Sequence, residues 1–167
     1  MRPATRTALA GGALAALANA KRLLKDAQAL LALGSAPTAY SLAVLAIEEA
    51  AKANDWQRIA AESGDAQVDL SRNHKDRLRP VRQSFDYLQA FKELMQDPDG
   101  YKAEPDESWR RRIEAEISTD NAMKQRGFYV DVDGDQVLEA SLITAAQAQA
   151  MVDDAAMAIA LMGSLMD

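Results

Sequence analysis

Apolar residues recur every three or four positions along most of the chain, which is the spacing of helices with one buried face. The pattern predicts a first long helix over about residues 5–33 and a second over about 37–62. Between them, Gly34 suits a left-handed C-cap, Ser35 can cap the next helix, and Pro37 is tolerated in a first turn. The two helices are therefore expected to meet at a short turn.

Two further helices and a hairpin are predicted in the middle of the chain. The third helix follows the apolar pattern from Leu70 to about Gln96, and Pro80 either kinks it or marks its true start. The fourth helix is expected to begin after a cap at Asp106 and to end at Gly127. Residues 128–138 break the helical pattern around an Asp-Gly pair, which suits a small β-hairpin.

A last helix is predicted to open at Ser141 or Thr144 and to carry a methionine-rich apolar stripe. Such a stripe indicates a face in a bundle core or in a dimer contact. The expected fold is therefore all-α, a helical bundle of about five helices with a small β-hairpin between the fourth helix and the last. The chain, 1–167, has the length of a single domain. The stripe consists of Met151, Ala155, Ile159, Met162 and Met166.

Composition narrows the function classes. Hydrophobic residues make up 49% of the chain and charged residues 26%, as in globular proteins. The absence of cysteine excludes disulfides, thiolate zinc sites and cysteine nucleophiles, and it agrees with an expected cytoplasmic location. The net charge of -6 argues against a broad nucleic-acid surface, although local basic clusters remain.

Two segments imitate membrane signals. Residues 2–20 have the basic start and apolar run of a secretory leader, but the run is mostly alanine and glycine, so it is interpreted as the start of a helix. Residues 27–47 carry no formal charge, yet the Gly-Ser-Ala-Pro sequence at 34–37 interrupts them. Two buried helices meeting at a turn explain this run better than a membrane span.

The second predicted helix carries the most informative polar residues. Tyr40, Val44, Glu48 and Lys52 recur every four positions and so share one side, while Glu49 lies about 100° away. A carboxylate near the interior is costly without a partner, so Glu48 should pair with Lys52 or meet a cation from another helix. A purely structural ion pair near the bundle end is the alternative interpretation.

Two other segments could take part in chemistry. His74 lies among basic residues, so it could move protons on a phosphodiester while its neighbours hold the phosphate. A solvent-facing histidine is the alternative. Residues 124–131 bring two cations, a phenol and a carboxylate together where the fourth helix gives way to the hairpin. Here the alternative is a capped helix end with an exposed turn.

No metal or other cofactor is expected. Glu48, Glu49 and His74 lack the repeated Glu-x-x-His pairs that bundle di-metal sites use. The alternating aspartates at 131–135 fail the calcium-loop pattern, which needs glycine at its sixth position and glutamate at its twelfth. A hairpin turn accounts for them better.

Four blocks of the sequence, in this order, resemble the AbiV family of abortive-infection proteins. They are residues 22–27, 38–52, 74–78 and 124–131, and the resemblance runs through most of the chain. AbiV proteins are similar to HEPN helical domains, many of which are metal-independent ribonucleases of toxin and antiphage systems that work as dimers. The resemblance therefore implies phage defence and a homodimer.

The resemblance also implies roles for individual residues. In a ribonuclease, His74 would shuttle the proton of a 2′-hydroxyl or leaving oxygen, and a nearby arginine would hold the phosphate. Glu48, Glu49 and Lys52 would order that catalytic site. The residues expected to bind the substrate are Arg72, Lys75, Arg77, Lys124, Arg126, Tyr129 and Asp131.

One departure from the HEPN pattern keeps two functions open. The usual ribonuclease signature is an arginine followed, after four to six residues, by histidine, and this chain lacks it. The protein could arrest infected cells by RNA cleavage or by blocking translation, with RNA, a phage activator protein or a translation component as partner. Alternatively, it is a non-enzymatic dimeric interaction module that binds a phage or host protein. Neither function involves a membrane.

Overall fold

The fold is all-α. In this computed structural model the described residues are 4–62, 97, 106–128, 131–133, 136–138 and 142–164. The third predicted helix lies outside them, so the count of five helices stays a prediction. The described elements are α1 (Arg6–Ala32), α2 (Ala36–Glu62), α4 (Asp106–Phe128), β1 (Asp131–Asp133), β2 (Gln136–Leu138) and α5 (Ala145–Ser164).

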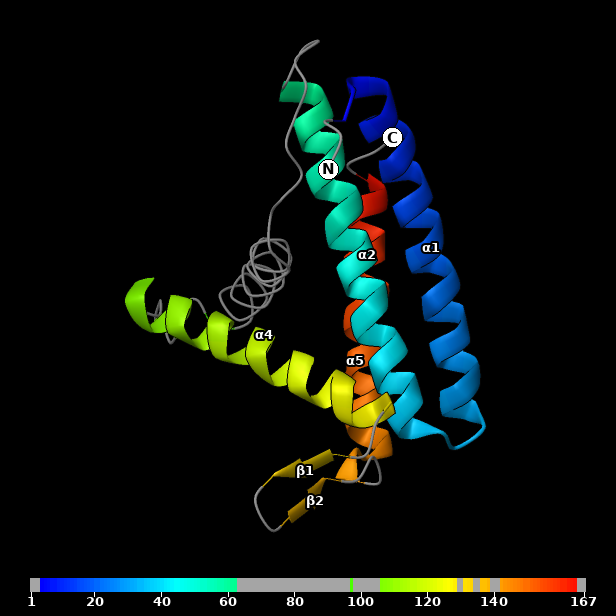
Figure 1. Ribbon diagram of the computed structural model, residues 1–167, viewed down its shortest axis with the longest axis vertical. Coiled ribbons are helices and arrows are strands. Elements are labelled where there is room, and N and C mark those ends of the chain that lie inside the picture. Colours follow the sequence, from blue (N-terminus) through cyan, green and yellow to red (C-terminus); the bar gives the residue numbers. More distant parts are fainter. Residues whose placement is uncertain are drawn as a thin grey trace.

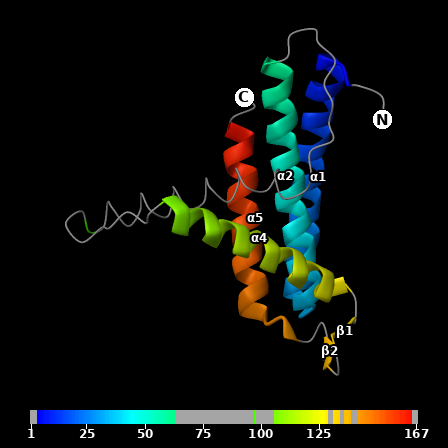
Figure 2. The same cartoon turned by 60° about the vertical axis from the view of Figure 1, so that its left-hand side comes forward.

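Among the described helices, α1, α2 and α5 form one bundle, and α4 crosses it. In Figures 1 and 2, α1, α2 and α5 run side by side, and the C-terminal end of α4 reaches them near the turn between α1 and α2. The start of α5 lies at this same end of the bundle. The end of α4 and the first turns of α2 therefore meet there.

The turn between α1 and α2 is the one that the sequence predicts. Gly34 has a φ of +80°, the left-handed conformation that favours glycine. The Ser35 N–H donates to the Leu30 carbonyl at 2.9 Å and the Gly34 N–H to the Leu31 carbonyl at 3.0 Å. These two bonds make a Schellman motif, which satisfies carbonyls left over at the end of α1.

Small side chains fill much of the core. The buried positions of α2 include Ala39, Ala43, Ala46, Ala50 and Ala53. Alanine lets helix backbones approach closely, and larger residues of the same core, such as those of α5, complete the packing. The predicted stripe on α5 is buried at its four described positions, which lie in the core: Met151, Ala155, Ile159 and Met162.

The start of α5 is held by a reciprocal cap. Thr144 Oγ1 accepts from the Gln147 N–H at 3.2 Å, and Gln147 Oε1 accepts from the Thr144 N–H at 2.9 Å. This is a capping box, in which two otherwise unpaired backbone donors are satisfied. Of the two starts that the sequence allows, Thr144 is the cap that the structure describes.

The Thr144→Ala variant tests this cap. It is expected to lower the free energy of unfolding by about 1 kcal/mol, because the N–H of Gln147 loses its acceptor. Urea denaturation followed by circular dichroism measures the change. Thr7→Ala, at an exposed position in the first turn of α1, is the matched control. Equal losses in the two variants would contradict the role of the cap.

The end of α4 corrects a prediction. The sequence pattern ends this helix at Gly127, but α4 continues through Gly127 to Phe128. A Cβ at Gly127 would lie 1.9 Å from Ser41 Oγ and 2.4 Å from the Pro37 carbonyl oxygen. The glycine therefore allows two helices to touch and does not end one of them. At the other end, Asp106, predicted as a cap, is the first residue of α4.

A short antiparallel pair of strands follows α4. Asp131 pairs with Leu138, Val132 with Val137 and Asp133 with Gln136. Both strands lie within residues 128–138, the range over which the sequence predicts a hairpin. Among the described residues, no helix combines the length and the apolar character needed to cross a bilayer.

Candidate functional site

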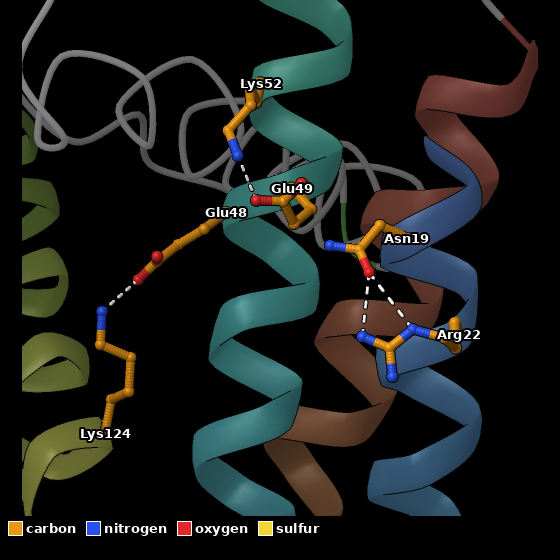
Figure 3. A network of polar contacts seen from close by, with 6 residues as sticks. All are labelled: Asn19, Arg22, Glu48, Glu49, Lys52 and Lys124. Carbon is orange, nitrogen blue, oxygen red and sulfur yellow. Dashed lines mark hydrogen bonds and ion pairs between the residues drawn. The ribbon is translucent and has the colours of Figure 1, made fainter. Parts of the chain in front are cut away.

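Glu48 of α2 meets a cation from another helix. Lys124 Nζ of α4 donates to Glu48 Oε1 at 2.6 Å (Figure 3). The side chain of Glu48 is 15% exposed and that of Lys124 is 9% exposed, so the pair is largely removed from water. Of the two partners that the sequence allows for Glu48, the structure therefore gives the cation from a different helix.

Lys52 pairs with Glu49. Lys52 Nζ donates to Glu49 Oε1, so Lys52 is not the partner that Glu48 takes of the two alternatives. The same ammonium lies 5.8 Å from the ring centroid of Trp56, within the range of a cation–π interaction. The Trp56 ring in turn lies against Gly12 of α1, where an added Cβ would come within 2.8 Å of it. Lys52 is therefore held between a carboxylate and an aromatic face.

Glu48 and Glu49 point in different directions because successive helical residues are rotated by about 100°. Figure 3 shows Glu48 reaching toward α4, while Asn19 and Arg22 of α1 lie on the side of Glu49. Arg22 donates to Asn19 Oδ1 from Nε at 3.3 Å and from Nη2 at 3.0 Å. Glu48, Glu49, Lys52 and Lys124 form what we call the polar cluster, in which two carboxylates balance two ammonium groups.

Two further contacts fix α4 on α2. Ser41 is fully buried, and its hydroxyl donates to the Lys124 carbonyl at 2.8 Å. The Pro37 carbonyl oxygen, 3.1 Å away, is a second acceptor within its reach. The buried Tyr40 donates its hydroxyl proton to Asp120 Oδ1 at 3.0 Å. Tyr40 and Asp120 were not predicted to pair. Their only sequence signal is that Tyr40 shares the Glu48 side of its helix.

A pocket of about 310 Å³ lies between α4 and α5. Asp120, which accepts from Tyr40, lines this pocket one helical turn before Lys124. Arg112 donates to Glu116 at 3.1 Å on its wall. Charged side chains make up most of the lining, with an alanine, a threonine and a methionine among them. Its lining is Arg112, Ala115, Glu116, Thr119, Asp120, Met151 and Asp154.

Of the remaining predicted site residues, two lie in described elements and five lie outside the described residues. Arg126 lies half-buried in the last turn of α4, where a cation interacts favourably with the helix dipole. The backbone of Asp131 begins β1. Within the described part of the chain, no three histidine, cysteine or acidic side chains gather closely enough to hold a metal ion. The predicted site residues that lie outside the described residues are His74, Arg72, Lys75, Arg77 and Tyr129.

The comparison with known families covers most of the chain. The HEPN_AbiV family model, described as AbiV, matches residues 8–160. This range includes α2, α4, all of α1 except its first two residues, and all four residues of the polar cluster. No curated protein and no solved structure matches the chain.

Proposed function

The chain belongs to the AbiV family, and from this premise we propose that it is an antiphage abortive-infection protein that arrests infected cells through the polar cluster. The cluster joins two of the family-like blocks, residues 38–52 and residues 124–131. These blocks are far apart in sequence, and the pair between Glu48 and Lys124 brings them together across α2 and α4.

The burial of Glu48 and Lys124 is the observation that carries the proposal. Taking both charges out of water costs several kcal/mol, and apolar side chains of similar volume often give equal or greater stability. The neighbouring positions of α2 are mostly alanine and other apolar residues, so apolar side chains in place of Glu48 and Lys124 would match their surroundings. We therefore propose that the pair of Glu48 and Lys124 serves the defence function and not stability alone.

The cluster has the chemistry to engage an anionic ligand. An ammonium group such as that of Lys124 can hold a phosphate oxygen, and a positioned carboxylate can orient a neighbouring donor. In the ribonuclease form of the proposal, His74 moves the proton without a metal, and Arg72, Lys75, Arg77 and Arg126 hold the phosphate. In the translation-blocking form, the same cations bind a component of translation.

A non-enzymatic interaction module is the second candidate. Two observations favour it. The chain lacks the arginine-to-histidine spacing of HEPN ribonucleases, and the charges of the polar cluster cancel one another. In this version the chain is a dimeric domain that recognises a phage or host protein, and the cluster shapes the binding surface.

Phage infection of cells that express the protein tests the defence role. We expect wild-type protein to reduce the phage yield per infected cell, and Glu48→Gln to raise it to the yield of cells without the protein, because the neutral amide no longer balances the charge of the Lys124 ammonium. The matched control is Glu62→Gln, since Glu62 forms an exposed pair with Arg58 at the end of α2. Full protection by Glu48→Gln would contradict the role of the cluster.

Incubation of purified protein with cellular RNA separates the two candidates. The reaction contains a chelator, because the proposed ribonuclease needs no metal. Cleavage by wild type that is lost in both His74→Ala and Glu48→Ala, at equal stability, supports the enzyme. Intact RNA under conditions in which the protein protects cells supports the interaction module.

A further inference from the structure

Lys124 is held at both its ends. Its carbonyl accepts from the Ser41 hydroxyl at 2.8 Å, while its ammonium donates to Glu48 at 2.6 Å. Ser41 and Glu48 are seven residues apart on α2, which places them on one face about two turns from each other. The same residue of α4 therefore bridges two points along α2, one through its backbone and one through its side chain.

Gly127 permits this arrangement. It lies three residues after Lys124, on the turn of α4 that touches the first turn of α2. A Cβ there would come within 2.4 Å of the Pro37 carbonyl oxygen, a backbone atom that cannot rotate away, and within 1.9 Å of Ser41 Oγ. Restoring ordinary contact distances would move the end of α4 by about 1 Å or more.

Such a movement would act on Lys124 first. The Ser41 hydroxyl is fully buried and would keep the Pro37 carbonyl as an acceptor, but the Lys124 carbonyl would lose the hydroxyl as a donor at a place that water does not reach easily. The end of α4 would have to leave the surface of α2 or rotate on it. Either change displaces the base of the lysine side chain from which the ammonium reaches Glu48.

We infer that Ser41 and Gly127 are positioning residues that set Lys124 against Glu48. They act through the close approach of α4 to α2, and they touch no ligand themselves. This inference rests on the proposed function, because it assigns both residues to the service of the polar cluster. Its test is nevertheless separate, since the pairing of Lys124 can be observed without phage.

The experiment compares Gly127→Ala and Ser41→Ala with two controls in the full chain. The first control is Gly163→Ala, because a Cβ at this glycine of α5 meets nothing within 4 Å. The second is Ser164→Ala, since the exposed Ser164 hydroxyl donates to the Leu161 carbonyl of its own helix at 2.8 Å. Circular dichroism measures folding. The ¹⁵Nζ ammonium signal of Lys124, identified by its loss in Lys124→Met, reports the pair.

We expect Gly127→Ala and Ser41→Ala to keep the helical signal but to lose or shift the Lys124 ammonium signal, with both controls unchanged. If Gly127→Ala does not fold, Ser41→Ala decides alone, because it removes a single oxygen. An unchanged ammonium signal in the folded variants overturns the inference. A lost ammonium signal together with full phage protection supports the positioning role of these residues and overturns the proposed role of the polar cluster in defence.

Discussion

Replacing Lys124 by methionine is expected to lower the free energy of unfolding by about 2 to 4 kcal/mol, because a largely buried Glu48 carboxylate loses its cation. Urea denaturation followed by circular dichroism measures the loss. Lys25→Met is the control, since Lys25 is exposed on α1 and its replacement should change stability by about 0.5 kcal/mol or less. Equal losses in the two variants would show that the burial of the pair carries no energetic consequence.

Removing both charges together should reverse most of that loss. In Glu48→Leu/Lys124→Met, neither member of the pair is left as a buried charge without the other, and the two apolar side chains have volumes similar to those they replace. The double variant is therefore expected to be at least as stable as the wild type. Because it lacks the chemistry of the polar cluster, it separates the contribution of the pair to stability from its contribution to defence.

Enlarging an alanine of the core is the second large expected effect. Ala50 of α2 is fully buried, so Ala50→Leu must push neighbouring helices apart or adopt a strained rotamer. We expect it to lower the free energy of unfolding by about 1 to 3 kcal/mol. Ala18→Leu, at an exposed position of α1, is the matched control in the same denaturation experiment. Equal free energies of unfolding for the two variants would contradict the close packing of the core around its alanines.

Local signals in the sequence predicted the helices well where the cause of each boundary is local. Gly34 and Thr144 lie next to the backbone groups that they cap; Gly34 is predicted as the C-cap, and Thr144 is one of the two starts predicted for the last helix. The apolar spacing of α5 likewise predicted its buried face, because burial of a helix face follows directly from periodicity.

Gly127 shows where local reasoning fails. Glycine can end a helix or allow another helix to approach, and the flanking sequence is compatible with both. Only the arrangement in space, with Pro37 and Ser41 against this glycine, decides between them. The hydroxyl of Ser41 could not be assigned a partner from sequence for the same reason.

The partner of Glu48 could not be chosen from local sequence either. Periodicity predicted that this carboxylate needs a cation, but Lys52 and a lysine of another helix satisfy that need equally. The resemblance to AbiV proteins drew attention to residues 124–131, and the structure places Lys124 of that block on Glu48. The pair between Tyr40 and Asp120 carried no such signal, since Asp120 lies outside every block.

The most direct test of the central claim is the phage yield per infected cell with the Glu48→Leu/Lys124→Met variant, expressed at the level of the wild type and shown to be equally stable. If the buried pair serves defence, this variant gives the same yield as cells without the protein. Protection equal to that of the wild type would contradict the claim and make the pair a structural feature of the crossing between α2 and α4.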